Sequence, residues 1–123
     1  MKNTIRGILI DPYTKTLSYT DIELNDHGGC LKGLYKAINC DLVELVRLSK
    51  DLDLWVDEEG LLKIDEDTKY FHTEGMSNPI AGRGVLLGNK RTKEGVDATD
   101  CPYTIDDVLS KITFREFSFN PFY

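Results

Sequence analysis

A glycine-flanked arginine is the part of this sequence best suited to bind a ligand. Gly82-Arg83-Gly84 is followed by Gly88. Backbone N–H groups that glycine leaves uncovered, together with one guanidinium, can bind an anionic group. A dinucleotide-binding G-x-G-x-x-G motif would need glycine at Leu87, and no Lys and Ser/Thr pair completes a phosphate-binding loop. The alternative is a tight turn that leads into a buried strand.

Other cations and aromatic side chains could complete an anion site around Arg83. A cation would bind the charge of the ligand, and an aromatic ring would stack on its planar part. The candidates that join Arg83 and its glycines are Lys63, Arg47, Arg6, Trp55 and Tyr13. Trp55 is the single tryptophan, and it could equally pack beneath a helix. Tyr13 could equally pack on a sheet face.

The excess negative charge lies in one segment, residues 51–78. The chain has 15 Lys and Arg against 21 Asp and Glu, a net charge of −6, and this segment holds nine acidic and two basic residues. Asp57-Glu58-Glu59 could bind the basic surface of a partner protein. The alternative is a solvated hairpin whose charges discourage aggregation between strand edges. The negative balance argues against direct nucleic-acid binding.

Nucleophiles and metal ligands are few and scattered. Neither the histidines nor the cysteines show ligand-pair spacing, so we expect no metal, no cofactor and no catalytic residue; these residues are His27, His72, Cys30, Cys40 and Cys101. Catalysis is left open, with the balance against it. An odd set of cysteines favours reduced thiols in the cytoplasm. No apolar run is long enough for a secretion signal or a membrane span.

The first half of the chain predicts two hairpins and a helix. Thr4–Leu24 is typical of a hairpin, with a β-bulge near Thr20-Asp21 where the apolar phase changes. A helix follows, capped by Asn25 or Asp26 and stopped at Asn39. Strict alternation then predicts a second hairpin, with strands at 42–48 and 52–57 and with Leu52, Leu54 and Val56 facing inward.

The second half predicts shorter elements. A strand begins at Leu61-Leu62-Lys63-Ile64, and residues 65–78 are polar and typical of a loop. A short buried strand follows Gly84, and residues 89–100 resemble a turn. Thr104 and Asp107 have the spacing of a capping box for a short helix. Residues 113–119 can form a closing strand, followed by an aromatic tail.

These elements predict an α+β domain over residues 1–123. We expect a mainly antiparallel sheet built from hairpins, with one longer and one short helix packed on it. The composition, 41% hydrophobic and 29% charged, is that of a chain that can bury one core. The aromatic tail 117–123 must be covered, either by folding back or by contact between copies in a homo-oligomer.

Five segments taken in order resemble a family of small domains of unknown function common in phages, plasmids and mobile elements of Gram-positive bacteria. Those segments are Ile5–Pro12, Leu34–Asp41, Asp57–Lys63, Gly82–Gly88 and Thr104–Val108, and the D-E-E-G-x-L-K turn at 57–63 is the most specific. The resemblance implies an accessory role in the host cytoplasm and supplies no activity.

Together these observations favour a non-catalytic protein that sequesters a small anionic ligand, such as a nucleotide-derived immune signal of the host. Two alternatives stay open. One is inhibition of a host protein through the acidic hairpin 51–78. The other is an enzyme that cleaves nucleotides. No membrane partner is expected.

Overall fold

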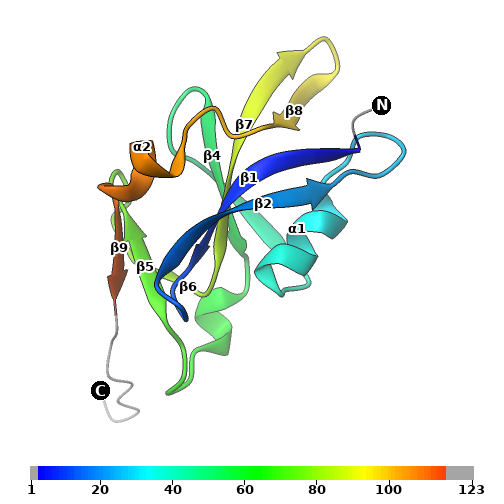
Figure 1. The fold of residues 1–123 in the computed structure, drawn as a ribbon. Helices are drawn as coiled ribbons and strands as arrows, with labels where there is room; N and C mark the ends of the chain where they lie inside the picture. Colours follow the sequence, from blue (N-terminus) through cyan, green and yellow to red (C-terminus); the bar gives the residue numbers. More distant parts are fainter. Residues whose placement is uncertain (1–2, 116–123) are drawn as a thin grey trace.

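Two antiparallel sheets and three short helices make up residues 3–115, the part of the chain that the computed structural model describes (Figure 1). The first sheet has the order β2-β1-β7-β4-β3, with β8 paired to β7, and the second has the order β6-β5-β9. The strands are β1 (Thr4–Asp11), β2 (Thr16–Glu23), β3 (Val43–Arg47), β4 (Leu52–Asp57), β5 (Tyr70–Thr73), β6 (Ile80–Ala81), β7 (Gly84–Thr92), β8 (Gly95–Thr99) and β9 (Ile112–Arg115). The helices are α1 (Leu31–Ile38), the 3₁₀ helix η1 (Gly60–Lys63) and α2 (Ile105–Leu109).

This architecture confirms the predicted α+β class with a mainly antiparallel sheet. The predicted contrast between one longer and one short helix is small, because α1 spans eight residues and α2 spans five. The aromatic tail 117–123 lies outside the described residues.

The central strands of the first sheet, β1, β4 and β7, contribute side chains to a core on each face. One core lies between this sheet and the second sheet with α2, and it includes Ile8, Leu54, Phe71 and Leu86. The other core lies beneath α1 and includes Ile22, Leu34, Val85 and Leu87. Figure 1 shows the layers in this order, with β5 and β9 on one side of the first sheet and α1 on the other. Because side chains alternate along a strand, burial on both faces requires a continuous apolar run such as 85–87.

The predicted β-bulge near Thr20-Asp21 is wrong. The ladder between β1 and β2 runs unbroken from Thr4 opposite Glu23 to Asp11 opposite Thr16. The apolar phase changes along β2 because its two ends face different cores. Leu17 packs against the core between the sheets, and Ile22 belongs to the core beneath α1.

The predicted strand at 61–64 is also wrong. Residues Gly60–Lys63 form η1, in which the N–H of Leu62 donates to the carbonyl of Glu59 at 2.9 Å. The segment follows a turn in which the Asp57 carboxylate accepts the N–H of Glu59. In this helical conformation 83% of the Leu62 surface is exposed. The Leu61-Leu62 pair that suggested a strand therefore buries little apolar surface.

Two predicted loops contain strands. Residues 65–78 include β5, whose Phe71 is fully buried between polar neighbours. Residues 89–100 continue β7 to Thr92 and return as β8. The expected caps at Asn25 and Asp26 are displaced, because α1 begins at Leu31. The Asn25 side chain instead accepts N–H groups of the loop that leads to α1.

Other local predictions are confirmed. The hairpin of β3 and β4 buries Leu52, Leu54 and Val56 on one face. Asn39 ends α1 in the left-handed conformation with φ 62°. Thr104 and Asp107 form the predicted capping box of α2, in which each side chain accepts the backbone N–H of the other.

Gly33 allows α1 to lie directly against β2. A Cβ at this position would come within 2.7 Å of the backbone N and O of Glu23. On an open helix, alanine would stabilise the protein by about 1 kcal/mol relative to glycine. Here the added methyl meets backbone atoms that cannot move aside without displacing the helix.

Gly33→Ala should therefore lower the free energy of unfolding by about 1 to 3 kcal/mol, the usual cost of overpacking. Urea denaturation measures this loss. Lys32→Ala is the matched control, because Lys32 is exposed on the same helix, and it should change stability by less than about 0.5 kcal/mol. A Gly33→Ala protein as stable as the wild type would contradict the close contact.

The capping box makes α2 sensitive to acid. The backbone N–H of Thr104 donates to the Asp107 carboxylate at 2.8 Å, and this hydrogen bond lowers the pKa of Asp107 in the folded protein. The stabilisation is therefore complete above the unfolded pKa of about 3.9 and is lost as the pH falls through the lower folded value.

In Asp107→Asn protein, the free energy of unfolding should fall less steeply below about pH 4 than in the wild type. Urea denaturation over a pH series measures the slope. Asp106→Asn is the control, because Asp106 lies on α2 and takes no part in the capping box. Equal slopes for the wild type and Asp107→Asn would rule out this origin of acid sensitivity.

Candidate ligand-binding site

Strand register sets two carboxylates beside Arg83. Gly84, at the start of β7, lies opposite Ile10 of β1 on one side and opposite Val56 of β4 on the other. Asp11 and Asp57 are the last residues of β1 and β4, one residue beyond these pairs, and Arg83 immediately precedes β7. Four predicted ligand-binding residues share a hollow of about 150 Å³ at this end of the sheet, and Asp57 also lines it; the four are Tyr13, Lys63, Gly82 and Arg83.

Asp11 positions both Arg83 and Tyr13. Its Oδ2 accepts a hydrogen bond from Arg83 Nε at 3.3 Å, and its Oδ1 accepts the backbone N–H of Tyr13 at 2.9 Å. The guanidinium lies over the Tyr13 ring, 5.0 Å from its centroid, within the range of a cation–π contact. Among the described residues, Arg83 bonds only through Nε, so its terminal Nη groups retain donors for a further acceptor.

Asp57 plays the same double role for Lys63. Its Oδ1 accepts the N–H of Glu59 at 2.9 Å, and its Oδ2 lies 3.1 Å from Lys63 Nζ. The hydrogen bond to Asp57 raises the pKa of Lys63 and so favours its ammonium form further. An ammonium has three donors, and Asp57 accepts one of them.

The two glycines beside Arg83 serve different purposes. Gly82 has φ 86°, in the left-handed region, which redirects the chain between β6 and β7. Gly84 permits close packing, because a Cβ there would come within 2.8 Å of Phe71 Cζ. The two interpretations of this segment are therefore compatible, because the chain turns into a buried strand and a hollow lies beside Arg83.

Three predicted ligand-binding residues lie elsewhere. The Arg6 guanidinium lies over the Tyr19 ring, with its Cζ 4.7 Å from the ring centroid. Arg6 is about 17 Å from Asp11 along β1. Arg47 pairs with the buried Asp53 at 3.1 Å. Trp55 packs in the core beneath α1, with its Nε1 buried and without a hydrogen-bond partner in the described chain.

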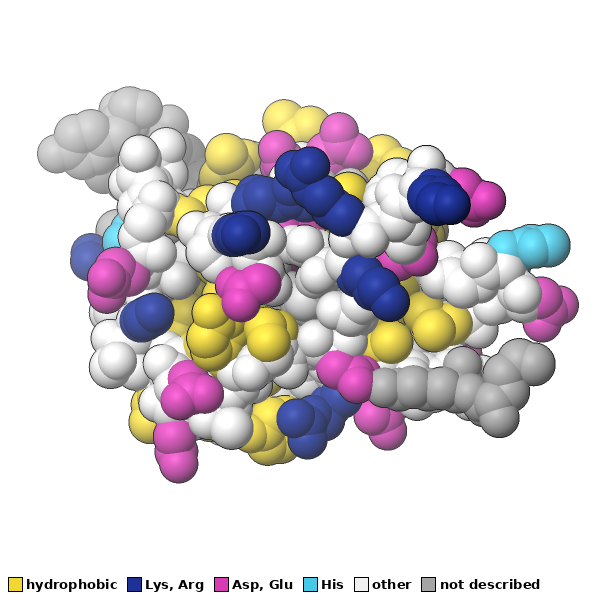
Figure 2. Space-filling model, turned by 90° about the horizontal axis from the view of Figure 1, so that it is seen from above, with side chains coloured by type: hydrophobic (Ala, Val, Ile, Leu, Met, Phe, Trp, Pro, Cys, Tyr) yellow, Lys and Arg dark blue, Asp and Glu magenta, His cyan; other side chains and the backbone are white. Residues whose placement is uncertain are grey.

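The predicted acidic surface is divided by internal contacts. Asp57 is mostly buried beside Lys63, Glu59 is half-buried, and Glu58 is exposed. Asp51 accepts a hydrogen bond from the Tyr103 hydroxyl at 3.1 Å. On the face seen from above, Figure 2 shows basic and acidic side chains interspersed with hydrophobic ones.

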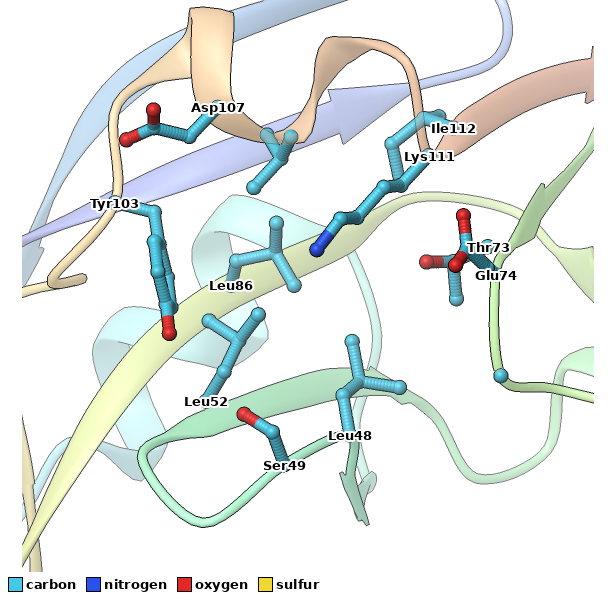
Figure 3. A pocket seen from close by; sticks show the side chains of 12 residues that line it. Leu48, Ser49, Leu52, Thr73, Glu74, Leu86, Tyr103, Asp107, Lys111 and Ile112 are labelled. Atoms are coloured by element: carbon cyan, nitrogen blue, oxygen red, sulfur yellow. The ribbon is translucent and has the colours of Figure 1, made fainter.

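A larger pocket of about 300 Å³ was missed by the sequence reasoning. It lies where the β3–β4 turn, β7, α2 and the β5–β9 pair meet, and Figure 3 shows its lining. Leu52 and Leu86 contribute to its floor, and Tyr103, Lys111 and Glu74 contribute polar groups. No motif marks these positions in the sequence, because they come from five separate elements.

Clusters of metal ligands and membrane-spanning helices are both absent from the described residues. Within residues 3–115, no group of three or more His, Cys, Asp or Glu side chains is placed to hold a metal ion. No helix in the same range is both long and apolar enough to cross a membrane.

The fold and these hollows define a class of protein: a small α+β domain of two antiparallel sheets, with one hollow at an end of the first sheet and a larger pocket between the sheets. The chain belongs to the family described as domain of unknown function (DUF3846), whose model matches residues 5–110. This membership confirms the predicted resemblance to a family of small domains of unknown function. Searches of curated proteins and of solved structures each returned no match.

The link between Asp57 and Lys63 is directly measurable. Asp57→Asn should lower the pKa of Lys63 toward its ordinary value, because the amide no longer favours the charged ammonium. NMR titration of the Lys63 side chain measures this pKa. Glu58→Gln removes an adjacent exposed carboxylate and should leave the Lys63 pKa unchanged. An identical pKa in Asp57→Asn and wild type would show that the pair does not form in solution.

Proposed function

We propose that this protein binds a small anionic ligand in the hollow between Arg83 and Lys63. The observation that supports this most directly is the pair of oriented cations in one hollow. Asp11 holds Arg83 through Nε, and Asp57 holds Lys63 through a single ion pair, so both cations keep further donors. Such donors, fixed in advance, bind carboxylate or phosphate oxygens at little entropic cost.

The size of the hollow limits which part of the ligand it receives. Pockets that enclose a whole drug-sized ligand usually span about 300 to 1,000 Å³, so about 150 Å³ suits the anionic group alone. The rest of the ligand would lie at the surface, where Tyr13 is 45% exposed. A planar base or ring stacked beside Tyr13 fits this arrangement.

The charges in the site favour recognition through directed hydrogen bonds. Asp11 and Asp57 offset the charges of Arg83 and Lys63, so the four groups together are formally neutral. Long-range attraction is therefore weak, and affinity depends on the geometry of the remaining N–H donors. We expect moderate dependence of binding on salt.

We favour binding of the anionic ligand without its cleavage. The described lining of the hollow contains neither histidine nor cysteine, the side chains that most often serve as base or nucleophile. In the finer form of the proposal, the ligand is a nucleotide-derived immune signal of a host cell. The protein is then a cytoplasmic accessory of a phage or another mobile element.

Calorimetric titration with cyclic nucleotides and ADP-ribose-type nucleotides tests the proposal. At least one should bind the wild type, and Arg83→Ala should weaken that binding about tenfold or more, as expected for loss of a charge-assisted hydrogen bond. Arg47→Ala is the matched control, because Arg47 forms a similar Asp pair at another place on the same sheet. It should leave the affinity unchanged.

Two outcomes would count against the proposal. Absence of binding across the panel would rule out this class of ligand. Equal losses of affinity in Arg83→Ala and Arg47→Ala would rule out this site. Mass spectrometry of the ligand recovered after incubation separates retention from hydrolysis. Recovery of a cleaved product, absent with Arg83→Ala protein, would establish the enzymatic alternative.

A further inference from the structure

The larger pocket has a floor built from the core between the two sheets. Leu86 of β7 and Leu52 of β4 are both buried, and Val108 of α2 is 4% exposed. Leu48 and Ile112 complete the apolar side. This surface is continuous with the packed core, so its shape is fixed by the fold, and an aliphatic group placed on it would be removed from water.

An ammonium group projects over this floor. Figure 3 shows the Lys111 side chain extending across the leucines, with Glu74 on a different wall of the pocket. The backbones of these two residues are joined, because the N–H of Glu74 donates to the carbonyl of Lys111 at 3.0 Å. Their side chains nevertheless form no ion pair with each other, and within residues 3–115 Lys111 Nζ has no hydrogen-bond partner.

Two other polar groups at the pocket are already engaged. The Asp107 carboxylate accepts the backbone N–H of Thr104 in the α2 cap. The Tyr103 hydroxyl donates to Asp51. Lys111 and Glu74 are therefore the two charged side chains at this pocket whose hydrogen-bonding capacity the described fold does not use.

We propose that this pocket binds a zwitterionic ligand, an α-amino acid with an apolar side chain. The ligand carboxylate would pair with Lys111, its ammonium with Glu74, and its side chain would lie on the floor near Leu86. A volume of about 300 Å³ is at the lower limit for ligand pockets, which suits a molecule of this size. A simple carboxylic acid would form no pair with Glu74, and a simple amine would form none with Lys111.

This second site is separate from the hollow at Arg83. The two pockets share no lining residue. The site goes beyond the proposed anion binding, and either proposal can fail without the other.

The experiment is calorimetric titration of the full chain with L-leucine, isocaproate and isoamylamine. Isocaproate keeps the aliphatic group and the carboxylate, and isoamylamine keeps the aliphatic group and the ammonium. Leucine should bind at least about tenfold more tightly than either analogue, because each lacks one charge-assisted pair. Absence of leucine binding, or equal affinity for either analogue, would overturn the proposal.

Variants assign the binding to this pocket. Lys111→Ala and Glu74→Gln should each weaken leucine binding about tenfold or more. Lys93→Ala and Glu94→Gln are matched controls on the exposed β7–β8 turn and should bind leucine as the wild type does. Arg83→Ala should also bind leucine normally. Unchanged affinity in Lys111→Ala and Glu74→Gln, or loss in the controls, would overturn the assignment.

Discussion

Burial of the start of β7 on both faces is the constraint on which the rest of the structure depends. Val85 and Leu87 face the core beneath α1, and Leu86 faces the core between the sheets. Each apolar side chain needs a cover, so α1 must lie on one face and the second sheet with α2 on the other. Loss of either layer would expose a row of fully buried side chains.

The same pairing that buries β7 also assembles the candidate site. The ladders from β7 to β1 and β4 end together at Gly84, so Arg83, Asp11 and Asp57 all follow directly from the last pairs at this end of the sheet. A slip of one residue would turn the apolar side chains of β7 to the wrong cores and would separate Arg83 from Asp11. Stability of the core and geometry of the site thus have a common origin in the register.

The sequence predicted local features more reliably than features that depend on distant contacts. The β3–β4 hairpin and the α2 cap were predictable because alternation and capping act over a few residues. β5 was missed because its four residues are held by the two-residue strand β6 and by β9, and β9 is remote in sequence. Tyr13, Lys63 and Arg83 were found by residue type, whereas their meeting, and the Lys111 pocket, depend on tertiary pairing that no spacing encodes.

The position of Trp55 makes it an intrinsic fluorescence probe of one layer of the protein. It is the single tryptophan in the chain, and it packs in the core beneath α1, paired along the strands with Val85 and Leu45. Its emission therefore reports the polarity of that layer. Loosening of the helix can thus be followed by fluorescence.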